Sequence, residues 1–96
     1  MDWDRSAQQL HDQVRGLVPW PSATTVIDGV RYKVWSTTLT GERTEKSPGS
    51  VVQADKRGLK LACGDGQVLQ IDELQPDGKK RMAAAAFLLG HPIAVD

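Results

Sequence analysis

Residues 24–35 read TTVIDGVRYKVW, two β-branched runs separated by the pair Asp28-Gly29. An Asp-Gly pair in this setting is a strong hairpin signal, because both residues of a tight turn must tolerate positive φ. A period of two in the second run places alternate residues on opposite faces of the strand. One face then carries Val30, Tyr32 and Val34, and the other carries Arg31, Lys33 and Trp35. The stretch therefore predicts an antiparallel hairpin with one apolar and one basic face.

Three more short strands are expected downstream of this hairpin. Residues 40–50 are polar and rich in turn formers, which predicts a loop, and strand patterns follow at 50–54, 59–63 and 67–74. Gly64-Asp65-Gly66 offers a tight turn before the last of them. Several short strands separated by Gly and Pro turns indicate a sandwich or a small barrel. The order of the strands in the sheet stays open at this point.

Helical patterns lie at both ends of the chain. Within residues 1–17, apolar side chains recur at alternating steps of four and three, namely Trp3, Ala7, Leu10, Val14 and Leu17. Asp4 or Ser6 is expected to cap the start of this helix, and Gly16 suits the left-handed position at its end. A stiff Pro-Trp-Pro connector occupies residues 18–22. Residues 82–90 are rich in helix formers and predict a short second helix.

Composition limits the classes of protein that the chain can represent. Its 96 residues suit one domain with a modest core. Twelve Lys and Arg balance twelve Asp and Glu, although residues 31–60 carry seven cations against three acids, a local net of +4. No apolar run approaches the ~20 residues that cross a bilayer, so no membrane partner is expected. One cysteine, Cys63, and the absence of a secretory pattern point to the cytoplasm.

Two segments carry a resemblance to a known family. Residues 11–21, HDQVRGLVPWP, resemble the connector that opens the C-terminal domain of methionyl-tRNA formyltransferases. Residues 74–82, LQPDGKKRM, continuing to Gly90, are similar to that family's closing motif. Shorter matches at 33–35 and 62–66, and the pair Pro48-Gly49, fall between them in the family's order. The resemblance covers nearly the whole chain.

This resemblance implies a fold and a function. The fold is mainly β, a small Greek-key barrel of the oligonucleotide-binding type over residues 23–75, with an N-terminal helix and a short C-terminal helix. The family's enzyme formylates initiator methionyl-tRNA with 10-formyltetrahydrofolate as co-substrate. Its catalytic residues belong to an N-terminal domain outside this chain, so no catalytic, cofactor-binding or metal-binding residue is expected here. The expected partners are initiator tRNA and that catalytic domain.

One position departs from the family's pattern. After the motif methionine, Met82, the family often has Ser or Thr, which can cap a helix, whereas this chain has Ala83. Because a missing cap typically costs ~1 kcal/mol, the departure leaves the start of the second helix open.

Lys79, Lys80 and Arg81, preceded by the flexible Gly78, form the first candidate site for nucleic acid. Cations bind phosphate oxygens and position a nucleic acid without reading its bases. The other interpretation of this segment is a solvated loop that keeps the surface soluble. The resemblance favours binding.

Further cations extend the candidate site if the fold brings them together. A strip several phosphates long would contain Arg31, Lys33, Lys56, Arg57 and Lys60. Arg15 either offsets the negative end of the first helix dipole or faces tRNA. Trp35 shares a face with two of these cations, so it could stack on a base, although strand tryptophans are more often part of the core.

Catalysis in this chain finds little support in the sequence. His11 and His91 lack a visible nucleophile or carboxylate arrangement, and a Cys63–His11 pair is the single formal dyad. Two histidines and one cysteine without ligand spacing do not predict a zinc site. Three other functions remain open: the equivalent domain of a sugar-nucleotide formyltransferase, a free-standing nucleic-acid-binding barrel, and a purely structural domain.

Overall fold

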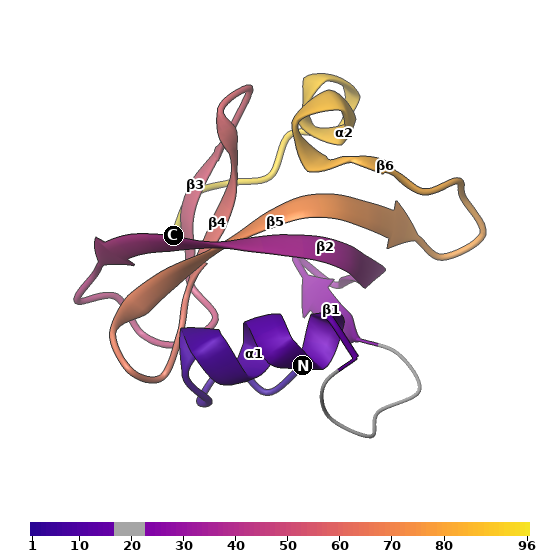
Figure 1. Ribbon diagram of the computed structural model, residues 1–96. Coiled ribbons are helices and arrows are strands. Elements are labelled where there is room, and N and C mark those ends of the chain that lie inside the picture. The colour runs from indigo at the N-terminus through magenta and orange to yellow at the C-terminus, as the bar shows by residue number, and fades with distance from the viewer. Residues whose placement is uncertain (17–22) are drawn as a thin grey trace.

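The computed structural model describes residues 1–16 and 23–96 (Figure 1). The predicted connector at 18–22, with its Trp20, and the last residue of the predicted first helix, Leu17, lie outside the described residues. The elements in chain order are α1 (Ala7–Val14), β1 (Thr24–Ile27), β2 (Val30–Arg43), β3 (Val51–Asp55), β4 (Gly58–Ala62), β5 (Gln67–Pro76), β6 (Met82–Ala83) and α2 (Ala84–Gly90).

The strands form one antiparallel sheet in the order β1-β2-β5-β4-β3, and the short β6 pairs with β5. Strands β3, β4 and β5 follow one another as hairpins, while β2 lies beside β5, which is a Greek-key arrangement. The sheet curls into a half-barrel, and α1 and α2 lie on opposite sides of it (Figure 1). The mainly β fold with a helix near each end is confirmed, and the curled sheet is consistent with the expected oligonucleotide-binding type.

The first hairpin forms as the Asp-Gly pair predicts. Asp28 and Gly29 have φ values of 51° and 76°, and Ile27 pairs with Val30 across the turn. Tyr32 and Val34 are each 3% exposed and belong to the main core. From Tyr32 onward, the predicted apolar face of this strand is the face that the protein buries, whereas Val30 next to the turn is 45% exposed.

Strand β2 is longer than the sequence pattern indicated. The predicted loop at 40–50 begins too early, because β2 continues to Arg43, which pairs with Gln67 of β5. The register shifts between Leu39 and Arg43, where Gly41 has a φ of 74°. A bulge of this kind interrupts the polar–apolar alternation and lets a long strand bend with the sheet. Because the alternation is interrupted, the sequence pattern indicates a loop where the structure has a strand.

Helix α1 begins at a capping box formed by Ser6 and Gln9. The Gln9 backbone N–H donates to Ser6 Oγ at 3.1 Å, and the Ser6 N–H donates to Gln9 Oε1 at 3.0 Å. Of the two predicted caps, Ser6 is thus the one used, and the helix is shorter than the predicted span 1–17. Leu10 on its inner face is buried in a small second core with Cys63.

The N-terminal segment is fastened to the sheet from two sides. Trp3, which the sequence pattern placed on the apolar stripe of the first helix, lies before α1; it packs against both cores, and its indole N–H donates to Thr25 Oγ1 at 2.9 Å. The Gly64 N–H donates to the Arg5 carbonyl at 2.8 Å. A Cβ on Gly64 would lie 1.7 Å from the Asp4 carbonyl oxygen, so glycine is required at this close approach.

Helix α2 begins later than predicted. Met82 and Ala83 pair with Leu74 and Glu73 of β5, so these two residues extend the sheet and the helix begins at Ala84. The N-cap residue, Ala83, makes no side-chain hydrogen bond to the first turn. Phe87 of α2 is buried in the main core, edge-on to Tyr32 at 5.6 Å between ring centroids. Among the described residues, no helix has the length and apolar character needed to span a membrane.

The uncapped start of α2 predicts a stabilising substitution. Ala83→Ser should raise the free energy of unfolding by ~1 kcal/mol, because the new hydroxyl can accept an orphan backbone N–H of the first turn. Ala86→Ser is the matched control at an exposed position inside the helix, where serine should lower stability by ~0.5 kcal/mol. Urea unfolding followed by circular dichroism measures both. Equal effects of the two variants would contradict the capping explanation.

Candidate nucleic-acid interface

Trp35 lies on the outer face of β2, where it is 37% exposed. Lys33 Nζ lies 4.1 Å and Arg81 Cζ lies 4.6 Å from the centre of its ring system. Its indole N–H donates to Gln75 Oε1 at 2.9 Å. The core interpretation of Trp35 is therefore wrong, because the apolar face of this strand is the opposite one. Two cations held at an aromatic ring make this face both positive and ordered.

Arg81 reaches this face through the pairing of β5 with β6, and Glu73 holds it there. The Arg81 Nε and one terminal nitrogen donate to the two Glu73 carboxylate oxygens at 3.0 and 2.9 Å. The Arg81 hydrogen bonds lower the pKa of Glu73, and the same contact raises the pKa of Arg81. The two-pronged contact fixes the orientation of the guanidinium while it compensates part of its charge.

Lys79 and Lys80 project from the turn between β5 and β6. Gly78 has a φ of 75°, and the Lys79 N–H donates to the Pro76 carbonyl at 3.0 Å, which closes the turn. The Gln75 side-chain amide donates to the Lys79 carbonyl at 2.8 Å. Both lysine side chains are exposed. The turn is therefore internally bonded while its charges face solvent.

Arg31 joins the same region through the pairing of β2 with β5. The Asp77 N–H donates to the Arg31 carbonyl at 3.4 Å, and Arg31, Lys79 and Lys80 line one cleft. Among the described residues, no acidic side chain forms an ion pair with Arg31, Lys33, Lys79 or Lys80. We use the name basic corner for Arg31, Lys33, Lys79, Lys80 and Arg81.

The remaining predicted cations do not join the basic corner, so the longer strip is wrong as a single surface. Lys56 and Arg57 occupy the β3–β4 turn, which lies at a different corner of the molecule from the β5–β6 turn (Figure 1). Lys60 Nζ lies 2.8 Å from Glu42 Oε1, and its side chain is 14% exposed. Arg15 follows α1 and lies 3.9 Å from Asp12, which suits the helix-end interpretation.

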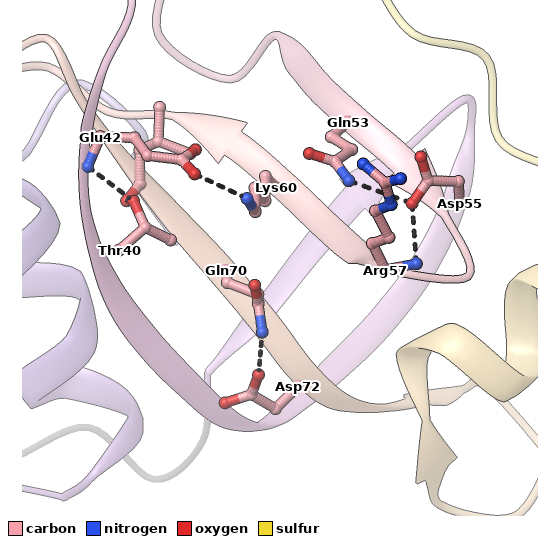
Figure 2. A network of polar contacts seen from close by, with 9 residues as sticks. Thr40, Glu42, Gln53, Asp55, Arg57, Lys60, Gln70 and Asp72 are labelled. Atoms are coloured by element: carbon pink, nitrogen blue, oxygen red, sulfur yellow. Dashed lines mark hydrogen bonds and ion pairs between the residues drawn. The ribbon is translucent and has the colours of Figure 1, made fainter.

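Figure 2 shows why the surface around Lys60 is a poor phosphate site. Glu42 neutralises Lys60, while Asp55 accepts hydrogen bonds from Gln53 and from the Arg57 backbone at 3.1 and 2.8 Å. These bonds lower the pKa of Asp55, so the carboxylate stays charged. Asp72 adds a further acid, with Gln70 donating to it at 2.7 Å. Acids and cations are balanced here, in contrast to the basic corner.

The Cys63–His11 pair, which the sequence allowed only as a formal possibility, does not form. Cys63 is 1% exposed, and burial raises its pKa to about 11, so its thiol is a core group. The His11 Nδ1 lies 2.7 Å from Thr37 Oγ1, while His91 stacks on Phe87 with 4.6 Å between ring centroids. No cluster of three or more metal-ligating side chains occurs among residues 1–16 and 23–96.

Sequence reasoning missed the residues that organise the basic corner. Gln75 and Glu73 hold Trp35, Lys79 and Arg81, but they lie more than 30 residues from Trp35 in the chain. Only the register of β2 against β5, which places Lys33 opposite Gln75, brings these side chains together. A long-range register leaves no local sequence signal.

Comparisons with known proteins identify relatives over nearly the whole chain. The family model described as "Formyl transferase, C-terminal domain" matches residues 1–92. A methionyl-tRNA formyltransferase from Enterococcus faecalis is 44% identical over 90 residues, and one from Bacillus subtilis is 41% identical over 90 residues. Each alignment covers 94% of this chain, which spans 29% and 28% of the two relatives' lengths.

A solved structure supports the fold. The structure of HypX from Aquifex aeolicus in complex with tetrahydrofolic acid matches all of this chain and 18% of its own, with a TM-score of 0.75. The identity is 16%, so the likeness concerns the fold alone.

The buried thiol predicts slow alkylation. At pH 8, Cys63 in the folded protein should react with iodoacetamide far more slowly than in the urea-unfolded chain, because burial hides it and its raised pKa keeps the thiolate scarce. Mass spectrometry over time measures both rates, and the unfolded chain is the internal control. Rapid labelling of the folded protein would mean that Cys63 is an accessible nucleophile after all.

Proposed function

The chain belongs to the formyl transferase C-terminal domain family, and we propose that it is the tRNA-binding domain of a methionyl-tRNA formyltransferase. In this proposal the chain carries no catalytic group. It holds initiator tRNA in the cytoplasm, while an N-terminal catalytic domain transfers the formyl group from 10-formyltetrahydrofolate to the methionyl amino group. The co-substrate is bound by that domain, and no residue of this chain is assigned to it.

The observation that carries the proposal is the basic corner. Four of its cations, Arg31, Lys33, Lys79 and Lys80, form no ion pair with acids among the residues described, in a molecule whose net charge is zero. The names of the relatives from Enterococcus faecalis and Bacillus subtilis support tRNA as the ligand, in preference to a sugar nucleotide. A purely structural domain has no need of such a charge distribution.

The proposed mechanism is electrostatic. Lysine and arginine bind phosphate oxygens and release condensed counterions, which strengthens binding at low salt. Such contacts fix the position and orientation of a nucleic acid without reading its sequence. The domain would therefore hold the body of the tRNA while its acceptor end lies at the neighbouring catalytic site. Identity of the tRNA is then read elsewhere.

Removal of two lysines tests this mechanism. The double variant Lys79→Ala/Lys80→Ala should weaken tRNA binding about tenfold at low salt and reduce the slope of log K against log salt by about two, one for each lost phosphate contact. Filter binding across a salt series measures both quantities. Arg81 is left unchanged because it is also hydrogen-bonded to Glu73 and lies against the Trp35 ring.

Lys56→Ala/Arg57→Ala is the matched control, because it removes the same charge from the β3–β4 turn. Equal losses for the two double variants would mean that total charge, and not the basic corner, governs binding. Initiator and elongator tRNAs should lose affinity by a similar factor. A loss confined to initiator tRNA would show that the corner reads identity, contrary to the proposal. No tRNA affinity in the unmodified chain would favour the sugar-nucleotide or structural alternatives.

The Arg81–Glu73 contact gives a test in which the salt dependence of tRNA binding should increase. Glu73→Gln removes the negative charge beside Arg81, so Arg81 should gain a phosphate contact, and the salt slope for tRNA should increase by about one. Glu42→Gln, which removes the partner of Lys60 on the balanced surface of Figure 2, is the control and should leave the slope unchanged. An unchanged slope for Glu73→Gln would exclude Arg81 from the RNA contact.

A further inference from the structure

A cleft of about 850 Å³ opens beside the basic corner, between the start of β2, the β5–β6 turn and α2. The cleft is lined by Arg31, Lys79 and Lys80 together with Asp28 and Asp77, and all five residues are exposed, so they form its rim. Its walls are mostly apolar or aromatic and include Tyr32, Met82, Phe87, His91 and Ile93. Cations at the rim of an apolar, aromatic-lined cleft form an arrangement that the phosphate-binding role does not require.

We propose that this cleft receives an unpaired base of the bound RNA, while Arg31, Lys79 and Lys80 hold the adjoining phosphates. The inference rests on the proposed function and deepens it. Binding of phosphates alone needs an open positive surface. A hollow next to that surface suits a planar group that projects from the backbone, such as a base. The volume lies within the range of pockets that enclose small organic ligands.

The aromatic groups of the cleft are arranged for stacking. The His91 ring lies on Phe87, with 4.6 Å between centroids and 6° between ring planes, and Phe87 meets Tyr32 edge-on. His91 is exposed while Phe87 is buried, so one imidazole face is packed and the other faces outward. A base against that outer face would extend the stack to a third ring. Stacking of this kind tolerates any base, because every base has a π face.

The two acids at the rim also favour a nucleotide over a purely apolar ligand. The carboxylates of Asp28 and Asp77 repel phosphate, but they can accept hydrogen bonds from an exocyclic amino group of a base or from a ribose 2′-hydroxyl. Arg31 and the two lysines supply the opposite charge within the same cleft. An apolar side chain of a protein partner would leave both sets of charges without a match. A duplex offers no free base, because its bases are stacked and paired.

The experiment compares two RNA strands that differ only in their bases. One probe is a short single-stranded RNA, and the other is an abasic strand with the same number of phosphates. The unmodified chain should bind the normal strand about tenfold more tightly, the effect expected for one stacked base. Equal affinities for the two strands would overturn the base-binding role, whether phosphates alone or a protein partner then account for the cleft.

Two variants connect that preference to the cleft. Val30→Trp adds bulk at an exposed position that lines it, and His91→Ala removes the stacking ring at an exposed position. Each should abolish most of the preference for the normal strand and leave binding of the abasic strand unchanged. Leu89→Trp is the matched control, since Leu89 is 78% exposed on α2 and does not line the cleft. Circular dichroism establishes that all three variants fold.

The outcomes separate this inference from the proposed function. If the unmodified chain binds tRNA and both variants keep the full preference for the normal strand, the cleft is not the base site and only the inference fails. If the unmodified chain binds neither tRNA nor either strand, the proposed function fails and the inference fails with it. Loss of binding to both strands in His91→Ala would also overturn the inference, because it would assign the residue to the phosphate contact.

Discussion

The antiparallel pairing of β2 with β5 runs from Tyr32 opposite Pro76 to Arg43 opposite Gln67 and crosses the whole sheet. Side chains alternate between the faces of a strand, so a register slip of one residue would exchange the buried and the exposed sets. Burial of Tyr32 and Val34 under α2 opposes such a slip, because their apolar area would return to water. The core therefore determines, as a by-product, that Lys33 lies opposite Gln75.

Net neutrality and a positive site are compatible because the charges are sorted by location. On the surface shown in Figure 2, Lys60 forms an ion pair with Glu42, and Asp55 accepts hydrogen bonds from its neighbours. Opposite charges in contact cancel at short range, and salt screens what remains beyond about 10 Å. The basic corner has five cations, and the acids that the described residues place beside them are Glu73, Asp28 and Asp77, so positive charge is in excess on that side.

Local sequence signals predicted the elements of the fold whose cause is local. The Asp28-Gly29 turn, the Ser6 cap and the buried side of β2 follow from φ preference, capping chemistry and alternation. The extension of β2 to Arg43 did not, because a bulge at Gly41 breaks the alternation on which strand prediction depends.

The same distinction applies to the candidate site. Lys79 and Lys80 were found because they are consecutive, and Arg31 and Lys33 because they share a strand face. The pairing of Lys60 with Glu42 and the hydrogen bond of Trp35 to Gln75 could not be found, since both depend on pairings between distant strands. Composition counts charges, but only tertiary contacts decide which of them remain available to a ligand.

Gln75 links the sheet register to the shape of the corner. Its side-chain oxygen accepts the Trp35 indole N–H, and its side-chain amide donates to the Lys79 carbonyl, so one residue spans the strand face and the turn. Arg81 lies 4.6 Å from the centre of the Trp35 ring and is oriented by Glu73. Side chains ordered before binding lose less conformational entropy when a ligand arrives. The conformational entropy of the turn is therefore lost during folding and not during binding. The exposed lysine ammonium groups stay free to follow an irregular phosphate backbone.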